Sequence, residues 1–237
     1  MQRYFVDKRK DDYFYLNEDD TYHVTKVMRM KLFEYIEVVY DGHLYLCEIL
    51  SFDPIVECKL VEEIDEIKNQ IPKVIIAQAL VKEQKMDYIL QKSCELGVSS
   101  IIPYSSSRSL IKVSDNDTKK ITRWQKILKE ASEQSKRCDV PSLDAIVDIR
   151  YLINLPIKHK YLCSVNEKSK TIKSILSNID ISDTIIFVIG PEGGLADEEE
   201  EKLIKNGYVP VSLGTNVLRT ETASSFVLSA ICYEFMR

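Results

Sequence analysis

The chain has 237 residues, of which 45% are hydrophobic and 29% charged, with a formal net charge of −5. These proportions are typical of a globular protein with an apolar core, and the acidic balance argues weakly against a nucleic-acid partner. No apolar run approaches the roughly 20 residues that a membrane span needs, and the first residues lack the long apolar stretch of a signal peptide.

The charge is unevenly distributed along the chain. Residues 1–71 hold 9 basic and 16 acidic residues, a net of −7, whereas residues 105–137 hold 9 basic and 4 acidic residues, a net of +5. A basic patch on an acidic protein is compatible with docking on a phosphate backbone. A solvated helix face has the same composition, and on charge alone it is the favoured interpretation.

The six cysteines and three histidines are dispersed along the chain. No cysteine pair has the C-x-x-C spacing of a zinc or redox site, and most cysteines lie within apolar segments. The pattern predicts reduced cysteines that act as small core residues, no metal site, and a reducing cytoplasmic compartment.

The first seventy residues are predicted to form a small β-barrel. Strands are expected at 1–7, 34–40, 43–50 and 55–61, with a short helix at 22–30. The pair Asp41-Gly42 separates two alternating apolar runs, which is a strong hairpin signal. The charged segment 62–72 ends in proline and is predicted to link this barrel to the rest of the chain.

After this link, strands and helices alternate. Strands are expected at 74–81, 100–104, 160–165, 184–189 and 209–213, and helices at 84–96, 118–138, 197–206 and 222–236. The first strand is almost continuously apolar, as in strands that are buried on both faces. The alternation predicts a parallel sheet with helices on both sides.

Two glycine-bearing loops follow predicted strands, where open α/β sheets bind their ligands. The first is Gly190-Pro191-Glu192-Gly193-Gly194, and the second extends from Leu213 to Ala223 into the closing helix. Glycines allow a ligand to approach bare backbone. Neither loop has the dinucleotide or P-loop fingerprint. A tight turn and an ordinary capped helix with a surface ion pair remain alternatives for the two loops.

Short motifs occur in a fixed order along nearly the whole chain. They are Tyr4-Phe5-Val6, His23-Val24, Val27-Met28-Arg29, Lys85-Met86-Asp87, Gln91-Lys92, Glu95-Leu96-Gly97-Val98, Arg108-Ser109, Arg123-Trp124, Glu133-Gln134-Ser135, Arg137, Val140-Pro141, Gly190 to Gly194 and Leu218 to Ala223. In this order the chain resembles the RsmE family of SPOUT-class methyltransferases, which form 3-methyluridine in small-subunit (16S) ribosomal RNA. Lys136 and Asn216 depart from the family pattern at positions that bear on RNA contacts.

The resemblance implies the fold, the cofactor and the partners. It implies an RNA-binding PUA-like β-barrel over residues 1–70, followed by a SPOUT-type parallel α/β domain over residues 71–237 with a C-terminal trefoil knot. The implied cofactor is S-adenosyl-L-methionine, and the implied substrate is 16S ribosomal RNA or the small ribosomal subunit. A homodimer through the closing helix is also implied, without a metal.

The resemblance also assigns residues to the site. The cofactor is expected to contact Val165, Ile189, Gly190, Pro191, Glu192, Gly193, Gly194, Leu213, Gly214, Val217, Leu218, Thr220, Thr222 and Ala223. RNA is expected to contact Arg3, Arg29, Lys85, Arg108, Arg123, Gln134 and Arg137.

For the chemistry, a uridine imide nitrogen becomes a good nucleophile only when its proton leaves. Arg219 is expected to stabilise charge at the uracil carbonyls, while Glu133 or Glu221 accepts or relays the proton. Two other functions remain open. The first is a non-catalytic RNA-binding protein on the same scaffold, and the second is a nucleotide-dependent small-molecule enzyme with a Rossmann-like sheet.

Overall fold

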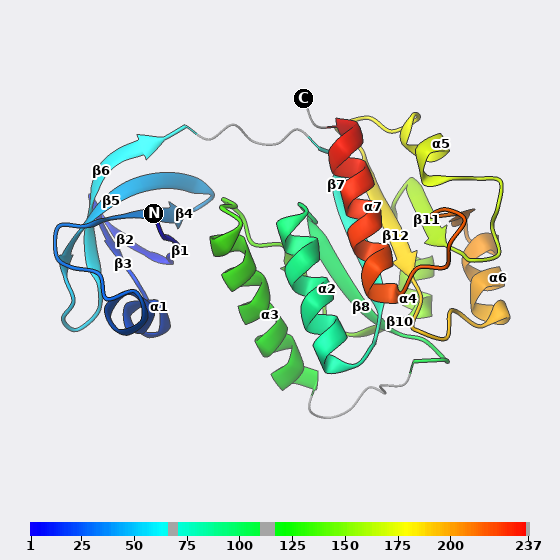
Figure 1. The fold of residues 1–237 in the computed structure, drawn as a ribbon, viewed down its shortest axis with the longest axis horizontal. Coiled ribbons are helices and arrows are strands. Elements are labelled where there is room, and N and C mark those ends of the chain that lie inside the picture. Colours follow the sequence, from blue (N-terminus) through cyan, green and yellow to red (C-terminus); the bar gives the residue numbers. More distant parts are fainter. Residues whose placement is uncertain (66–70, 110–116, 236–237) are drawn as a thin grey trace. The chain divides into compact units, whose positions relative to one another are not determined.

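A computed structural model describes residues 1–65, 71–109 and 117–235, apart from the side chain of residue 117 (Figure 1). Its internal contacts divide the chain into two units. The first unit comprises Met1–Lys68 and Lys129–Val140, and the second comprises Asn69–Leu128 and Pro141–Arg237. The sequence placed a single boundary near residue 70, whereas these contacts group the short stretch 129–140 with the N-terminal residues.

The first unit is built on a curled, mixed sheet of six strands with the order β1-β4-β5-β6-β3-β2. The strands are β1 (Arg3–Phe5), β2 (Lys8–Lys10), β3 (Tyr13–Tyr15), β4 (Tyr35–Tyr40), β5 (His43–Ser51) and β6 (Glu57–Ile64). The predicted hairpin is confirmed, because Tyr40 pairs with His43 across the Asp41-Gly42 turn. The inward-facing residues of the alternating runs, such as Ile36, Val38 and Ile49, form the apolar core.

The predicted helix at 22–30 is wrong in its bounds. The structure has an α-helix, α1 (Glu18–Tyr22), that continues into a π-helical turn, His23–Val27. Helix α1 starts earlier than predicted because the Asn17 side chain accepts a hydrogen bond from the Asp20 amide at 2.8 Å, which caps the helix. The short strands β2 and β3 were not predicted.

The second unit contains a parallel sheet of seven strands with the order β10-β8-β7-β12-β11-β13, in which β9 also pairs with β8. The strands are β7 (Lys73–Ala79), β8 (Ser100–Ser105), β9 (Ser142–Leu143), β10 (Val147–Asp148), β11 (His159–Cys163), β12 (Thr184–Ile189) and β13 (Val209–Val211). The expected parallel α/β fold is therefore confirmed. The central strands β7 and β12 are almost wholly buried, as continuous apolar runs predict.

Helices cover both faces of this sheet. They are α2 (Glu83–Glu95), α3 (Asp117–Gln134), α4 (Ile149–Ile153), α5 (Ile172–Leu176), α6 (Asp197–Lys205) and α7 (Thr220–Phe235). On one face, Leu152 of α4 and Leu203 of α6 pack with Ala77 and Val188. On the other face, α7 packs against α2 and lies over β7 and β12 (Figure 1). Within the described residues, no helix combines the length and apolarity that crossing a membrane would require.

The long helix α3 ends four residues before the predicted end. Lys136 adopts a left-handed conformation (φ 62°), and the Arg137 amide turns back to the Ser132 carbonyl at 3.0 Å, which closes the helix. Its apolar residues Trp124 and Leu128 are buried. The short elements β9, β10, α4 and α5 were not predicted.

Candidate functional site

A cavity of about 520 Å³ lies at the carboxyl ends of β11, β12 and β13 in the second unit. Three loops enclose it, namely 163–168, 189–195 and 212–219. Parallel strands end at the same edge of a sheet, so the loops that follow neighbouring strands meet there. The volume is within the range of pockets that hold small molecules and cofactors.

The loop after β12 requires glycine at its first position. A Cβ at Gly190 would lie 3.1 Å from the Leu195 amide nitrogen and 3.3 Å from the Gly194 carbonyl carbon, both of them backbone atoms. Gly194 is left-handed (φ 69°), and its amide donates to the Pro191 carbonyl at 2.9 Å. The loop therefore folds back on itself and presents backbone, rather than side chains, to the cavity.

Two buried hydroxyls fix the carbonyls at the start of this loop. The Tyr104 hydroxyl donates to the Ile189 carbonyl at 3.0 Å, and the Thr220 hydroxyl donates to the Gly190 carbonyl at 2.7 Å. Burial raises the pKa of Tyr104 well above its usual value, so this phenol stays protonated as a donor. The loop after β12 is thus tied both to β8 and to the first residue of α7.

Gln78, a wholly buried residue of β7, extends this network. Its side-chain amide nitrogen donates to the Thr220 hydroxyl at 3.0 Å and to the Ala79 carbonyl at 3.1 Å. Its side-chain oxygen is buried and has no hydrogen-bond partner within the described residues. A buried acceptor without a donor costs about 1–3 kcal/mol. The chain from Gln78 through Thr220 to Gly190 joins a central strand to two of the three loops.

Arg108 holds the far end of the same loop. Its guanidinium donates to the Leu195 carbonyl at 2.9 Å and to the Gly193 carbonyl at 3.3 Å. Glu199 in α6 fixes the backbone next to Arg108, because it accepts from the Ser107 amide at 2.8 Å. Burial opposes ionisation of Glu199, but hydrogen bonds, led by that amide, hold its pKa below the usual value.

The loop between β13 and α7 forms another wall of the cavity. Gly214 has a φ of 131°, which side-chain-bearing residues rarely adopt, and Val217 is 77% exposed. The Arg219 side chain is exposed at the cavity, and no hydrogen bond or ion pair within the described residues engages it. Its guanidinium is therefore available to a bound molecule.

The loop after β11 is tied to α6. The Ser164 hydroxyl donates to Glu200 at 2.5 Å, and the Lys168 ammonium donates to the Val165 carbonyl at 2.7 Å. Val165 itself is 57% exposed at the cavity. Its exposed side chain offers an apolar surface to a ligand.

Lys85 of α2 lies at the cavity between two carboxylates. Its ammonium is 3.0 Å from Glu192 Oε1 and 3.7 Å from Glu221 Oε2. Partial burial opposes ionisation of Glu192, but hydrogen bonds from its own amide and from Lys85 lower the pKa of its carboxyl. The lysine thus links the loop after β12 to the first turn of α7.

The structure brings most of the predicted cofactor residues together. Of those fourteen, all except Thr222 line the cavity, and Thr222 is exposed on α7. Of the predicted catalytic residues, Arg219 lines the cavity, and Glu221 is joined to it through Lys85. Glu133, the third, belongs to the first unit.

Glu133 lies in a partly buried cluster of charged groups. Its carboxylate is 3.4 Å from the Lys129 ammonium, which also contacts Asp20 at 2.6 Å, and it accepts from the Phe5 amide at 3.4 Å. Burial raises the pKa of Glu133 to about 7, with Asp20 adding to the rise and Lys129 opposing it. A carboxyl of that pKa is suited to exchange a proton near neutral pH.

The predicted RNA-contact residues differ in their surroundings. Arg3 is 5% exposed and donates to Glu37 and to the Lys136 carbonyl, so it serves the packing of the first unit and does not face solvent. Arg123 pairs with Glu83 and Asp87, and Arg137 pairs with Asp139. Arg108 and Lys85 lie at the cavity, while Arg29 and Gln134 are exposed. Lys112 of the basic stretch is outside the described residues.

Several residues of the site were missed by the sequence analysis. They are Gln78, Tyr104, Ser164, Asn166, Glu199 and Glu200. The rule that ligands bind at strand ends pointed to Asn166, which follows the predicted strand 160–165, whereas Ser164 was placed inside that strand. Gln78 and Tyr104 lie within apolar strands, where nothing in the local pattern distinguishes them from core residues. Within the described residues, no group of three or more histidine, cysteine, aspartate or glutamate side chains is arranged to hold a metal.

Comparison with known proteins connects this geometry to a family. Residues 68–232 match the family model described as an RNA methyltransferase domain. The ribosomal RNA small subunit methyltransferase E of Bacillus subtilis (strain 168) is 35% identical over 99% of this chain and 97% of its own length. The protein of the same name from Mesomycoplasma hyopneumoniae (strain 232) is 32% identical over 97% of this chain and 98% of its own.

Solved structures give the same result. The crystal structure of a ribosomal RNA small subunit methyltransferase E from Neisseria gonorrhoeae, bound to S-adenosyl methionine, has a TM-score of 0.87 to this chain. The two are 29% identical, and the match covers 99% of this chain and 98% of the other. The likeness therefore extends over both units and includes a relative that holds a nucleoside cofactor.

Proposed function

This chain belongs to the ribosomal RNA small subunit methyltransferase E family, and from that premise we propose that it methylates small-subunit ribosomal RNA with S-adenosyl-L-methionine as the methyl donor. The observation that carries the proposal is the cavity at the carboxyl ends of β11, β12 and β13, where the family's glycine loops meet. The chain supplies this cavity with backbone walls, a free guanidinium at Arg219 and a buried network that fixes the loops.

The residues at the cavity fit S-adenosylmethionine. A volume of about 520 Å³ suits a nucleoside with an amino-acid tail, and the fold of the cavity loop depends on Gly190, where a Cβ would press on the loop's own backbone. The apolar side chains of Val165, Leu213 and Leu218 offer contact surface to an adenine ring. When bound, the cofactor supplies an electrophilic methyl group, and the protein must position the acceptor and manage its proton.

We further propose that the acceptor is N3 of a uridine in 16S ribosomal RNA. This imide nitrogen must lose its proton, and the negative charge then spreads over the uracil carbonyls. Arg219 is placed to stabilise that charge, since its guanidinium at the cavity is unpaired within the described residues. Glu133 accepts the proton, or Glu221 does. The pKa of Glu133, raised to about 7 by burial, suits a base, whereas Glu221 is the carboxylate linked to the cavity through Lys85.

The same proposal assigns roles to the two parts of the chain. Residues 1–70 form the PUA-like RNA-binding domain, and residues 71–237 form the methyltransferase domain. The C-terminal trefoil knot that the family resemblance implies is part of the same proposal. RNA contacts are proposed at Arg29, Lys85, Arg108, Arg123, Gln134 and Arg137, leaving out the buried Arg3.

A homodimer through α7 is also proposed. Phe226 and Tyr233 are seven residues apart, so they share one face of this helix, and they are 40% and 80% exposed. Burial of such side chains against a second copy would remove apolar surface from water.

A cytoplasmic location is part of the proposal too. The RNA substrate supports it, and so do the six thiols, none of which forms a disulfide within the described residues.

The decisive experiment is methyl transfer from labelled S-adenosylmethionine to small-subunit ribosomal RNA from a strain that lacks this gene, with nucleoside analysis of the product. We expect one 3-methyluridine per RNA. A methylated small molecule and unmodified RNA would reverse the proposal. Cofactor binding by a folded protein without any transfer would favour a non-catalytic RNA-binding protein.

Two glycine variants provide a matched test of the pocket. Gly190→Ala places a Cβ against backbone and is expected to abolish cofactor binding in calorimetry. In Gly193→Ala the new Cβ approaches only the Arg108 side chain, at 3.8 Å and 4.0 Å, so the loop should keep its fold and binding should weaken less than in Gly190→Ala. If the two substitutions weaken cofactor binding equally, the close backbone contacts at Gly190 do not shape the cofactor pocket.

A further inference from the structure

The segment 21–33 of the first unit has an unusual charge for its surroundings. It contains no acidic residue, although residues 1–71 have a net charge of −7. Its cations are Lys26, Arg29 and Lys31, which are all exposed. No hydrogen bond or ion pair within the described ranges engages these three side chains. The segment 21–33 is thus a locally positive part of an acidic unit, and its charge is complementary to phosphate.

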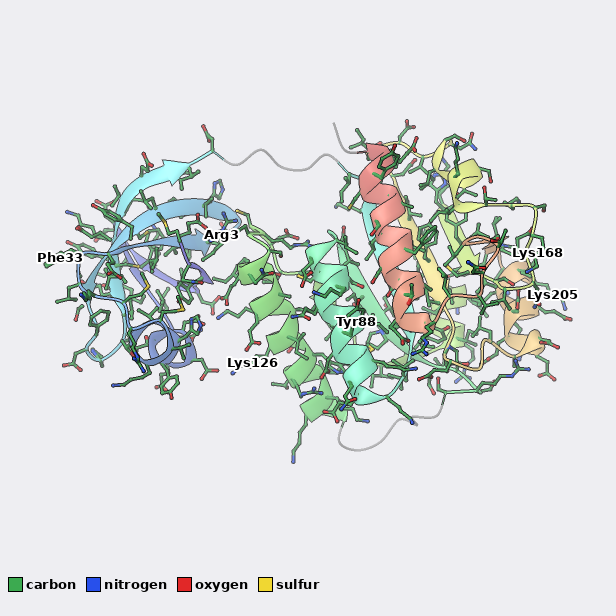
Figure 2. The ribbon with its side chains drawn as sticks, in the orientation of Figure 1. Arg3, Phe33, Tyr88, Lys126, Lys168 and Lys205 are labelled. Carbon is green, nitrogen blue, oxygen red and sulfur yellow. The ribbon has the colours of Figure 1, made fainter. Side chains whose placement is uncertain are left out.

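Apolar side chains are exposed beside these cations. Phe33 is 64% exposed, Val27 58% and Leu32 43%. Figure 2 shows Phe33 at the edge of the first unit, where its ring points away from the ribbon. Exposed apolar side chains gathered in one segment mark an interaction surface more often than isolated ones do.

The backbone holds Phe33 outward in a conformation that its side chain disfavours. The Glu34 amide donates to the Lys31 carbonyl at 3.3 Å and closes a turn in which Phe33 is the third residue, with a φ of 69°. Turns with a left-handed third residue favour glycine there, and a bulky residue in this region is strained. The Phe33 amide donates to the Ile49 carbonyl at 2.8 Å, and Glu34 accepts from the Lys31 amide at 3.2 Å.

We propose that Phe33 is a stacking platform for a base in a single-stranded segment of the substrate RNA, with Lys26, Arg29 and Lys31 binding the adjacent phosphates. Strained residues that the surrounding hydrogen bonds keep in place are concentrated at functional sites. An exposed aromatic ring flanked by free cations is the arrangement that binds single-stranded nucleic acid. A protein partner fits less well, because lysine is depleted at the centres of protein interfaces. This inference rests on the proposed function, and it adds a docking contact outside the cavity.

The test is Phe33→Gly in the full chain, which removes the ring and relieves the backbone. We expect the melting temperature to stay the same or to rise by about 2–4 °C. The affinity for an unmodified transcript of the small-subunit ribosomal RNA, measured by filter binding, should fall about 5- to 150-fold. Phe33→Trp, which keeps a ring, should bind within about threefold of the wild type. Asp41→Gly, another exposed left-handed position, is the control for backbone relief and should not change RNA affinity.

A second measurement addresses the phosphates. Lys31→Ala should reduce the slope of log affinity against log salt concentration by about 0.7, the value for one phosphate on a single strand.

Unchanged RNA affinity in Phe33→Gly would overturn the proposal. So would a loss seen only with the assembled small subunit, since that would place a ribosomal protein on this surface. In each case the wild type would still bind the cofactor and methylate the RNA, whereas failure of the proposed function would remove methylation by the wild type itself.

Discussion

The Thr220 hydroxyl joins the loop after β12 to the buried Gln78 side chain. Thr220→Val removes this hydroxyl and keeps the size and branching of the side chain, so it tests the role of the hydroxyl alone. The substitution removes the donor to the Gly190 carbonyl and the acceptor for Gln78, whose bonds are 2.7 Å and 3.0 Å long. The substitution loses two hydrogen bonds and leaves the Gly190 carbonyl and one Gln78 N–H unpaired in a largely buried place. It should therefore lower the free energy of unfolding by about 2–4 kcal/mol. For a chain of this length that corresponds to a fall in melting temperature of roughly 5–15 °C.

The same substitution should weaken cofactor binding, because the Gly190 carbonyl then lacks the group that orients it. We expect the dissociation constant for S-adenosylmethionine, measured by calorimetric titration at a temperature where the variant is folded, to rise about tenfold, or about 1.4 kcal/mol. Thr220→Ser keeps the hydroxyl and is the matched control, expected within about threefold of the wild type. If the valine variant loses stability but binds the cofactor as tightly as the serine variant, the hydroxyl does not position the loop.

Gln78→Leu supplies the second arm of a double-mutant cycle. It breaks two hydrogen bonds, to Thr220 and Ala79, but it also removes the buried side-chain oxygen that has no partner within the described residues. These contributions nearly cancel, so stability should change by only about 1 kcal/mol while cofactor affinity falls. Gln78→Leu combined with Thr220→Val should show a coupling of about 1 kcal/mol. A coupling of zero would refute the continuous chain from β7 to Gly190.

Other predictions concern the chemistry and the assembly. Arg219→Ala should lower kcat at least 100-fold and leave the cofactor dissociation constant within about threefold, and equal losses in both would assign Arg219 to cofactor binding. Since the pKa of Glu133 is raised to about 7, the rate should increase with pH up to about 7, and Glu133→Gln should lower kcat about 100-fold. If Glu221→Gln abolishes this pH dependence and Glu133→Gln does not, Glu221 is the base. The raised pKa also means that ionising Glu133 destabilises the folded state progressively from about pH 4.5 to about 7, so Glu133→Gln should raise the melting temperature more at pH 8 than at pH 5. Tyr233→Asp on α7 should convert the dimer to a monomer in sedimentation, and a wild type that sediments as a monomer would contradict the proposed interface.

The local pattern of the chain was sufficient for much of the fold. The Asp41-Gly42 turn between two alternating runs determined the β4–β5 hairpin, because a two-residue turn of this type fixes the register of the strands on either side. The apolar strands and amphipathic helices of the second half predicted the parallel sheet. The glycines of 190–194 indicated a loop with bare backbone, and the family resemblance assigned that loop to the cofactor.

Contacts between residues far apart in the chain decided the rest. Gln78 and Thr220 are 142 positions apart, and Tyr104 meets the Ile189 carbonyl across 85 positions, so no local pattern distinguishes these polar groups from core or cap residues. The family resemblance predicted that Arg3 contacts RNA, but Glu37 and the Lys136 carbonyl, which lies 133 positions away, hold it inside the first unit. The sequence by itself determined most of the longer helices and strands and the loops that bear glycine, since both follow from the preferences of neighbouring residues. Only the tertiary structure decided which polar side chains are buried, what they bind and where the strain at Phe33 lies, because those properties belong to pairs of segments that meet on folding.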